Sequence, residues 1–231
     1  MNEKLREEFN QWVLDGRSAS LESHHLGFVE DVMQRMNVQP RDRILEVGCG
    51  EGWAARRLAS LVPEGLVVGL DGSDEMIRKA RAQSAGLENI LLLWADAEEI
   101  PWQEKFFTKV LCVEAFYYFE HPEKVLREIY RVLSPGGSVW IVNHLSKENQ
   151  LSLRWLTDLK VPVPLMTAAD YGEIFQRCGF EEFVHCMIPD RSSSPERSYG
   201  RWFPDPDELR RFQELGALLM TARRPAEGVG D

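Results

Sequence analysis

The sequence predicts an α/β protein built on a doubly wound, mostly parallel sheet. From about residue 43 onward, short apolar runs alternate with helix-like stretches, which is the pattern of consecutive βαβ units. Two further apolar runs near the end of the chain lie too close together for a full crossover helix between them. Parallel neighbours require such a crossover, so we expect the last two strands to form an antiparallel pair.

The N-terminal part is predicted to be helical. Residues 3–14 carry Leu5, Phe9 and Trp12 at helical spacing, and a second helix is expected over residues 26–36, before the turn at Pro40. The polar stretch between them is expected to be a loop. We therefore expect an N-terminal helical cover over residues 1–39 and a core domain over residues 40–231.

The alternating core begins after this cover. Strands are expected at residues 44–47, 66–70, 90–93, 110–113 and 139–142, and helices at 51–61, 74–84 and 122–133. Two more helices are expected at 149–160 and 168–178, and the late strands within GFEEFVHCMI and LGALLMTARR. Two inserts, at about 145–166 and 190–212, are expected on the substrate side. Residues 191–206 are expected to form either a disordered loop or a lid.

Composition narrows the class of protein. The 231 residues include 44% hydrophobic and 28% charged side chains, with a formal net charge of −10. Such an acidic chain is expected to avoid nucleic acid. The polar N-terminus does not resemble a signal peptide, and no apolar run approaches the length of a membrane span. The four cysteines form no C-x-x-C pair, so reduced thiols and a cytoplasmic location are expected.

A glycine-rich loop follows the first strand in ILEVGCGEGWAARRLA, residues 44–59. The dinucleotide fingerprint G-x-G-x-x-G would require glycine where Trp53 stands, and no P-loop Gly-Lys-Ser/Thr follows. The loop thus permits close approach of a ligand to the backbone without requiring a phosphate. Taken alone, it is equally well explained as a tight strand-to-helix turn.

Acidic residues follow the next two strands. Asp71 ends VVGLD, where a carboxylate can accept both hydroxyl groups of a ribose. Asp96 follows the third strand in WADAEEIP and is placed to accept an adenine amino hydrogen, although a turn-capping role explains it as well. A nucleoside without pyrophosphate fits this arrangement.

These motifs, in this order, resemble the class I S-adenosylmethionine-dependent methyltransferases. The resemblance rests on ILEVGCGEG, VVGLDGSDEM, WADAEEIPW and VLREIYRVLSPGGSVWIV, the last being typical of the small-molecule branch that includes the ubiquinone and menaquinone methyltransferases. It covers residues 40–145 well and the last two strands more loosely. It implies a Rossmann-like, seven-stranded sheet with an antiparallel last strand.

The resemblance also implies a set of cofactor-binding residues for S-adenosylmethionine and its product, S-adenosylhomocysteine. Asp71 would bind the ribose and Asp96 the adenine amine. The methionine part would contact Glu46, Gly48, Cys49, Gly50, Val113 and Glu114, and the adenine would lie beside Gly72, Met76 and Ala97.

Methyl transfer is an in-line displacement that the protein assists by alignment and desolvation. A general base is needed only when the acceptor carries a proton of high pKa. The candidates for a catalytic role are His25, Tyr117 and His144, although taken singly each histidine is more readily explained as a supporting polar residue and Tyr117 as a core residue. No metal is expected, because no third ligand stands at a suitable distance from His24 and His25 in the sequence.

The acceptor is expected to be a small, partly apolar molecule beneath a cover made by residues 12–25 and 191–206. The protein is expected to be a monomer or a homodimer without a membrane span. Alternatives remain: an RNA or protein methyltransferase, a nucleotide-binding oxidoreductase, and a non-catalytic S-adenosylmethionine-binding module.

Overall fold

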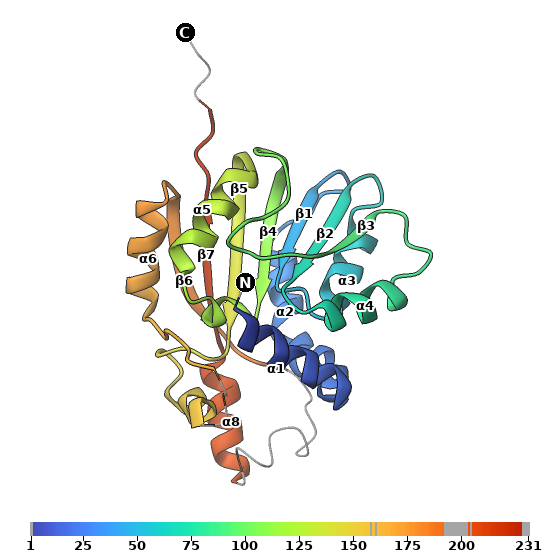
Figure 1. The fold of residues 1–231 in the computed structure, drawn as a ribbon. Helices are drawn as coiled ribbons and strands as arrows, with labels where there is room; N and C mark the ends of the chain where they lie inside the picture. The colour runs from blue at the N-terminus through green and yellow to red at the C-terminus, as the bar shows by residue number, and fades with distance from the viewer. Residues whose placement is uncertain (1, 158, 160, 192–202, 204, 228–231) are drawn as a thin grey trace.

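A computed structural model describes residues 2–157, 159, 161–191, 203 and 205–227. Its seven strands form one sheet in the order β3-β2-β1-β4-β5-β7-β6 (Figure 1). The bounds are β1 Arg43–Val47, β2 Leu66–Asp71, β3 Ile90–Trp94, β4 Phe107–Val113, β5 Leu133–Asn143, β6 Glu181–Ile188 and β7 Ala217–Arg223. Strands β1 to β5 pair in parallel, and β7 is antiparallel to both β5 and β6. The predicted seven-stranded, mostly parallel sheet is therefore confirmed.

Helices cover both faces of the sheet (Figure 1). The helices are α1 Glu3–Leu14, α2 Leu21–Arg35, α3 Trp53–Leu61, α4 Asp74–Gln83, α5 Pro122–Val132, α6 Ala168–Arg177 and α8 Pro206–Leu215, with 3₁₀ turns η1 Arg17–Ser20, η2 Phe116–Tyr118 and η3 Gln150–Thr157. Buried side chains of α5 and α6 pack on one face, and those of α2, α3 and α4 pack on the other. Both faces of the central strands are thus apolar, which explains their continuous hydrophobic runs.

Three expectations about local structure were wrong. The polar stretch after α1 is not a loop, because it forms η1 and the first turns of α2. The helix expected at 149–160 is a 3₁₀ helix over Gln150–Thr157. Helix α8, between the last two strands, was missed although Asp205 caps it and Pro206 occupies its first turn, which are usual helix-start signals. Most of the segment 191–206 lies outside the described residues.

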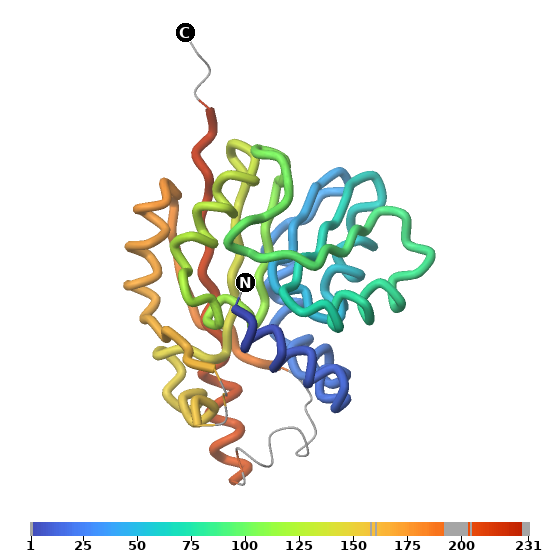
Figure 2. Tube along the Cα trace, in the orientation of Figure 1, coloured from blue at the N-terminus to red at the C-terminus, as the bar shows by residue number. Residues whose placement is uncertain are grey.

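Two helices lie beyond the edge of the sheet at which the parallel strands end. The chain in Figure 2 places α1 (blue) and α8 (orange-red) beyond the same edge of the sheet, which is the edge where β1 to β5 end.

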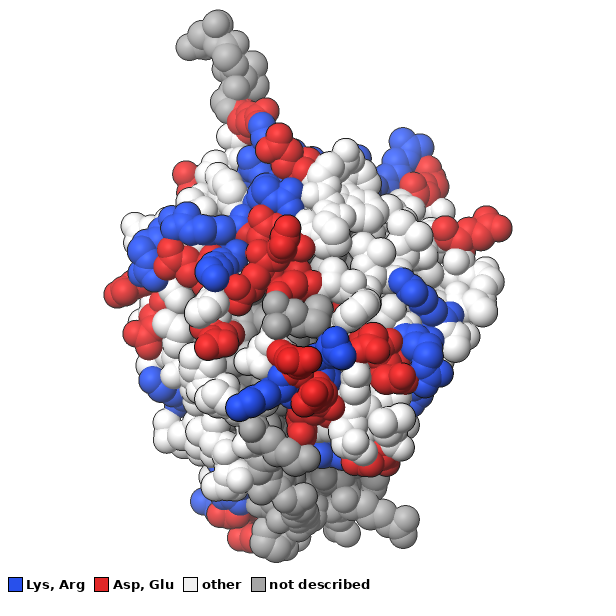
Figure 3. Space-filling model, in the orientation of Figure 1, with Lys and Arg blue, Asp and Glu red and all other residues white. Residues whose placement is uncertain are grey.

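On the face drawn in Figure 3, lysine and arginine are interspersed with aspartate and glutamate. Among the described helices, none combines the length and the apolar character needed to cross a membrane.

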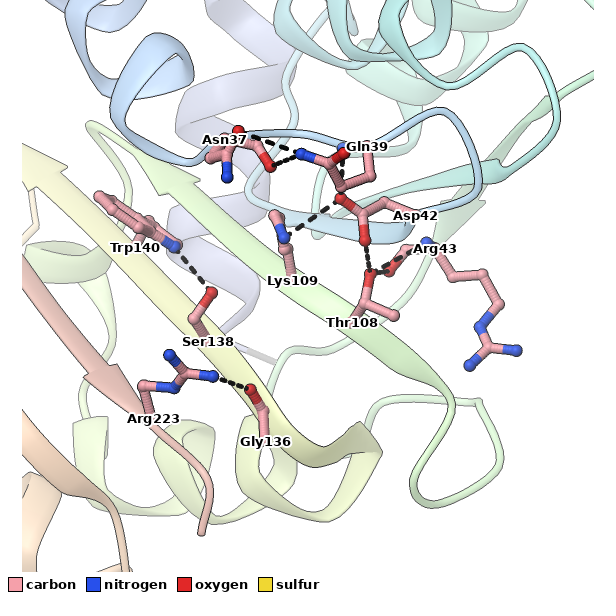
Figure 4. A network of polar contacts seen from close by, with 10 residues as sticks. All are labelled: Asn37, Gln39, Asp42, Arg43, Thr108, Lys109, Gly136, Ser138, Trp140 and Arg223. Atoms are coloured by element: carbon pink, nitrogen blue, oxygen red, sulfur yellow. Dashed lines mark hydrogen bonds and ion pairs between the residues drawn. The ribbon is translucent and has the colours of Figure 1, made fainter. Parts of the chain in front are cut away.

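The opposite edge, where β1 begins, is held by a polar network (Figure 4). Asp42 is buried; its carboxylate accepts a hydrogen bond from the Thr108 hydroxyl at 2.7 Å and lies 3.1 Å from Lys109 Nζ. Because these contacts join the start of β1 to β4, they stabilise the sheet without reaching the site described next.

Candidate active site

A cavity of about 570 Å³ opens at the carboxyl edge of the sheet. In doubly wound folds, ligands bind at this edge, near the point where the strand order reverses. The lining includes every residue that the sequence indicated for the cofactor or for catalysis: Glu46, Gly48, Cys49, Gly50, Asp71, Gly72, Met76, Asp96, Ala97, Val113, Glu114, His25, Tyr117 and His144. Segments far apart in the sequence thus meet at one site, although their individual roles remain proposals.

The glycine loop after β1 forms a tight turn. Gly48 has φ of 74°, and a Cβ atom there would lie 2.4 Å from the Cβ of Ala115, so only glycine fits. The backbone N–H groups of Gly48 and Cys49 both donate to the carbonyl of Leu70, at 2.8 and 3.0 Å. Strand β2 therefore fixes the loop, whose backbone faces the cavity.

Asp71 lies at the centre of this loop system. One carboxylate oxygen accepts the N–H of Gly50 at 2.8 Å, and the other accepts the N–H of Ser73 at 2.8 Å. Burial raises the pKa of Asp71, and these two backbone donors oppose the rise. Each oxygen keeps acceptor capacity after these bonds, so the carboxylate fits a vicinal diol such as a ribose.

Glu46 is 2% exposed and carries an oxygen without a hydrogen-bond partner among the described residues. Burial raises the pKa of Glu46 to about 8, with a further contribution from the charge of Asp71. A buried carboxyl with an unsatisfied oxygen is costly unless a ligand supplies the missing donor. The ammonium group of a methionine-like ligand is such a donor, and the site therefore fits S-adenosylmethionine.

Cys49 does not have the properties of a nucleophile. Its side chain is buried, and burial raises the pKa of the thiol well above its usual value. A reactive cysteine requires a stabilised thiolate. Cys49 instead packs against Gly69, where a Cβ atom would lie 2.9 Å from its sulfur.

Helix α1 crosses the cavity and is anchored to the start of α4. The Asn10 amide donates to Asp74 at 2.9 Å and accepts from the Ser73 hydroxyl at 2.5 Å. Phe9 packs edge-on against Tyr118, with ring centroids 5.0 Å apart. The sequence predicted a helical cover over residues 1–39, and Asn2, Leu5 and Arg6 from its first turns line the cavity.

The far end of the cavity is aromatic and contains the candidate acid–base groups. The Tyr117 hydroxyl donates to Glu114 at 3.2 Å, and the rings of Tyr117 and Tyr118 lie 4.5 Å apart. Burial lowers the pKa of His25 to about 4, although the charge of Glu114 opposes this shift. His25 is therefore a neutral imidazole at neutral pH. Within the described part of the chain, no three His, Cys, Asp or Glu side chains are grouped to hold a metal ion.

Comparisons with known proteins agree with this geometry. A family model described as a methyltransferase domain matches residues 45–141. The demethylmenaquinone methyltransferase of Geobacillus kaustophilus is 37% identical over 116 residues, which are 49% of this chain and 50% of that protein. That of Listeria monocytogenes is 34% identical over 118 residues, 50% of each chain. The chain thus spans about half the length of the curated relatives it matches.

Solved structures extend the similarity to almost the whole chain. A methyltransferase solved in complex with the Trm112 methyltransferase activator of Haloferax volcanii is 28% identical, with a TM-score of 0.85 over 94% of this chain and 98% of that one. An S-adenosylmethionine-dependent methyltransferase from Aquifex aeolicus shares the fold at 19% identity, with a TM-score of 0.64 over 88% and 92% of the two chains.

The strand order and the antiparallel seventh strand form the Rossmann-like sheet that the chain shares with these solved methyltransferases. The family match covers the glycine loop, Asp71 and Asp96. Residues 45–141 thus match the methyltransferase-domain family, and the chain as a whole has the fold of a solved methyltransferase.

Proposed function

We propose that this protein transfers a methyl group from S-adenosylmethionine to a small-molecule acceptor. The observation that carries the proposal is one continuous cavity, polar beside Asp71 and Glu46 and aromatic beside Tyr117 and Tyr118. The bound cofactor supplies the electrophilic methyl group, which passes from its sulfonium to a nucleophilic atom of the acceptor. The chain supplies alignment, desolvation and binding energy.

Each part of the lining has a role in this proposal. Asp71 holds the ribose, Asp96 and Met76 flank the adenine, and Glu46 and Glu114 face the methionine end. The aromatic rings at the far end attract a sulfonium through cation–π interactions and hold an apolar acceptor. Residues 1–39, with α1 across the cavity, form the cover that excludes water.

For an acceptor that carries a hydroxyl proton, His25 is our candidate base. It lines the cavity, and the charge of Glu114 nearby would stabilise the imidazolium that forms when His25 takes up the proton. Tyr117 and His144 are the other candidates from the sequence. The structure gives each of them a carboxylate contact that competes with contact to an acceptor.

An aromatic quinol is the first acceptor class to test, because the curated relatives act on demethylmenaquinone and the far end of the cavity is aromatic. We expect methyl-labelled S-adenosylmethionine to label a naphthoquinol or a related phenol. His25→Ala is expected to reduce turnover about 100-fold or more, as removal of a general base does, whereas His121→Ala, outside the cavity, serves as the control. Transfer to RNA or protein but to no small molecule would contradict the proposal. Binding without any transfer would favour a non-catalytic module.

A protein partner is a second proposal, favoured by the edge of the sheet at β3. Leu87, Leu91 and Trp94 are 44%, 45% and 50% exposed on or beside this edge strand. Exposed apolar edge strands are sites at which another chain adds a strand. The Haloferax volcanii relative was solved with a methyltransferase activator, so we propose an activator protein of that type as the occupant.

This second proposal is tested by co-purification with a Trm112-type activator of the same organism. Leu91→Glu is expected to abolish co-purification, because it places a charge on the apolar edge. Leu61→Glu is the matched control, since Leu61 is also 45% exposed but lies on α3. If both variants retained the activator equally, the activator would not bind at the β3 edge.

A further inference from the structure

Three side chains from the ends of three strands meet at the wall of the cavity, two of which line it. Glu114 follows β4, His144 follows β5, and Asp190 lies two residues past β6. Strand β6 is antiparallel to β7, which is antiparallel to β5, so β6 ends at the same edge as β4 and β5. The late hairpin thus delivers a carboxylate to the site, and neither the fold nor the family match assigns that carboxylate a role.

The imidazole of His144 lies between the two carboxylates. Its Nδ1 is 3.4 Å from Glu114 Oε1, and its Nε2 is 3.6 Å from Asp190 Oδ2. The exposed fractions of the three side chains are 1% for His144, 9% for Glu114 and 0% for Asp190. A neutral imidazole has a single N–H and can donate toward only one carboxylate, whereas an imidazolium can donate toward both.

The surroundings keep this imidazole in place and away from solvent. The ring of Phe28 on α2 lies 4.2 Å away and that of Phe212 on α8 lies 5.1 Å away, measured between centroids. Trp155 of η3 contributes a third ring at 6.3 Å. The other titratable groups nearby are His25 and His24 of α2, which interact electrostatically with Glu114 and Asp190, respectively. An imidazolium in this position would be attracted by the carboxylates on both of its sides.

Glu114 is the group that this arrangement positions. Its backbone is in the left-handed region, with φ of 51°, which is uncommon for a glutamate and requires support from its surroundings. Its carboxylate accepts from the backbone N–H of His144 and from the Tyr117 hydroxyl. Despite burial, these His144 contacts keep the pKa of Glu114 below its usual value.

We propose that Asp190 is a positioning residue that holds His144 as an imidazolium, and that the charged His144 in turn fixes the ionised Glu114 at the methionine end of the site. His144 is then a structural cation and not the base that deprotonates the acceptor. The link from Glu114 to the cofactor rests on the proposed function, whereas the protonation of His144 does not.

The test is nuclear magnetic resonance of histidine labelled with ¹⁵N, which distinguishes imidazolium from neutral imidazole. The chain has five histidines, and the spectrum of His144→Gln identifies the signals of His144. At pH 7.5 we expect a doubly protonated His144 in the wild-type protein. In Asp190→Asn, which keeps the shape and removes the charge, we expect its titration midpoint to fall by at least about one pH unit.

Two further variants make the result specific. Asp42→Asn removes a buried carboxylate at the opposite edge of the sheet and should leave the His144 signals unchanged. Asp190→Glu should retain the imidazolium, which keeps the test available if Asp190→Asn does not fold. A neutral His144 in the wild-type protein, or an unchanged midpoint in folded Asp190→Asn, would overturn the proposal.

A binding measurement tests the link to Glu114. Asp190→Asn is expected to weaken S-adenosylhomocysteine at least about threefold and to make its binding more dependent on pH below 7, because Glu114 loses its support. Unchanged binding with a shifted His144 midpoint would refute the link to Glu114. If Asp190→Asn lost turnover while His144 titrated as in the wild-type protein, the positioning role of Asp190 would be wrong, and the loss would have to be explained within the proposed function.

Discussion

At the scale of single residues, the Asp71 carboxylate fixes the glycine loop, and we propose that it also binds the cofactor. It holds the loop through Gly50 and Ser73 while keeping acceptor capacity for a diol. We expect Asp71→Ala to weaken S-adenosylhomocysteine by at least about tenfold, since bonds to a charged group contribute roughly 1.5–3 kcal/mol and 1.4 kcal/mol is one decade. Calorimetry measures the change, with Asp42→Asn as the buried-carboxylate control. An unchanged dissociation constant in the folded variant would exclude Asp71 from the cofactor site.

Glu46 predicts a dependence of binding on pH. Its pKa of about 8 in the free protein keeps the carboxyl protonated at neutral pH, whereas an ammonium group beside it favours the charged form. Binding should therefore release a proton, and affinity should rise between about pH 6.5 and 8.5. Calorimetry in buffers of different ionisation enthalpy measures the number of protons released on binding. Glu46→Gln should abolish this release, and a wild-type affinity that falls over this range would contradict the assignment.

The same group predicts a dependence of stability on pH. The folded pKa of about 8 lies above the ordinary value of 4.5, so between these values the folded state binds more protons than the unfolded state. Glu46 therefore lowers the free energy of unfolding as the pH rises from about 4.5 to 8. Glu46→Gln should be more stable than the wild-type protein at pH 9, as measured by urea unfolding. A variant that is less stable at that pH would show that the carboxylate is compensated in the free protein.

At the scale of elements, we expect helix α1 to move during cofactor exchange, because its residues line the cavity. Asn10→Ala removes three hydrogen bonds to the start of α4, each contributing about 1 kcal/mol. We expect S-adenosylhomocysteine to dissociate about five- to tenfold faster and residues 3–14 to exchange amide hydrogens faster. Gln11→Ala is the control, since Gln11 bonds Asp15 within the same exposed surface. Equal dissociation from both variants would argue against α1 as the cover.

Most core elements could be predicted from the sequence because buried parallel strands and amphipathic helices carry strong periodicity. The candidate site residues Asp71 and Asp96 could be predicted because they stand at or just after the ends of apolar runs, where the loops of the site begin. Asp190 could not be predicted in this way, because its approach to His144 depends on the direction of β6 in the finished sheet. Helix α8 was missed because its apolar face is short, and its burial depends on Phe212 meeting rings from η3.

At the scale of the whole molecule, the final strand runs away from the site. Strand β7 begins at the edge that carries the cavity and ends at the opposite edge, whereas Asn2 lines the cavity itself. The two ends of the described chain are therefore unequal as attachment points. An affinity tag joined beyond residue 227 can tether the protein to a surface with its cavity facing the solution. The same tag placed directly before Asn2 should hinder seating of α1 and weaken S-adenosylhomocysteine, and calorimetry on the two tagged forms would reveal the difference.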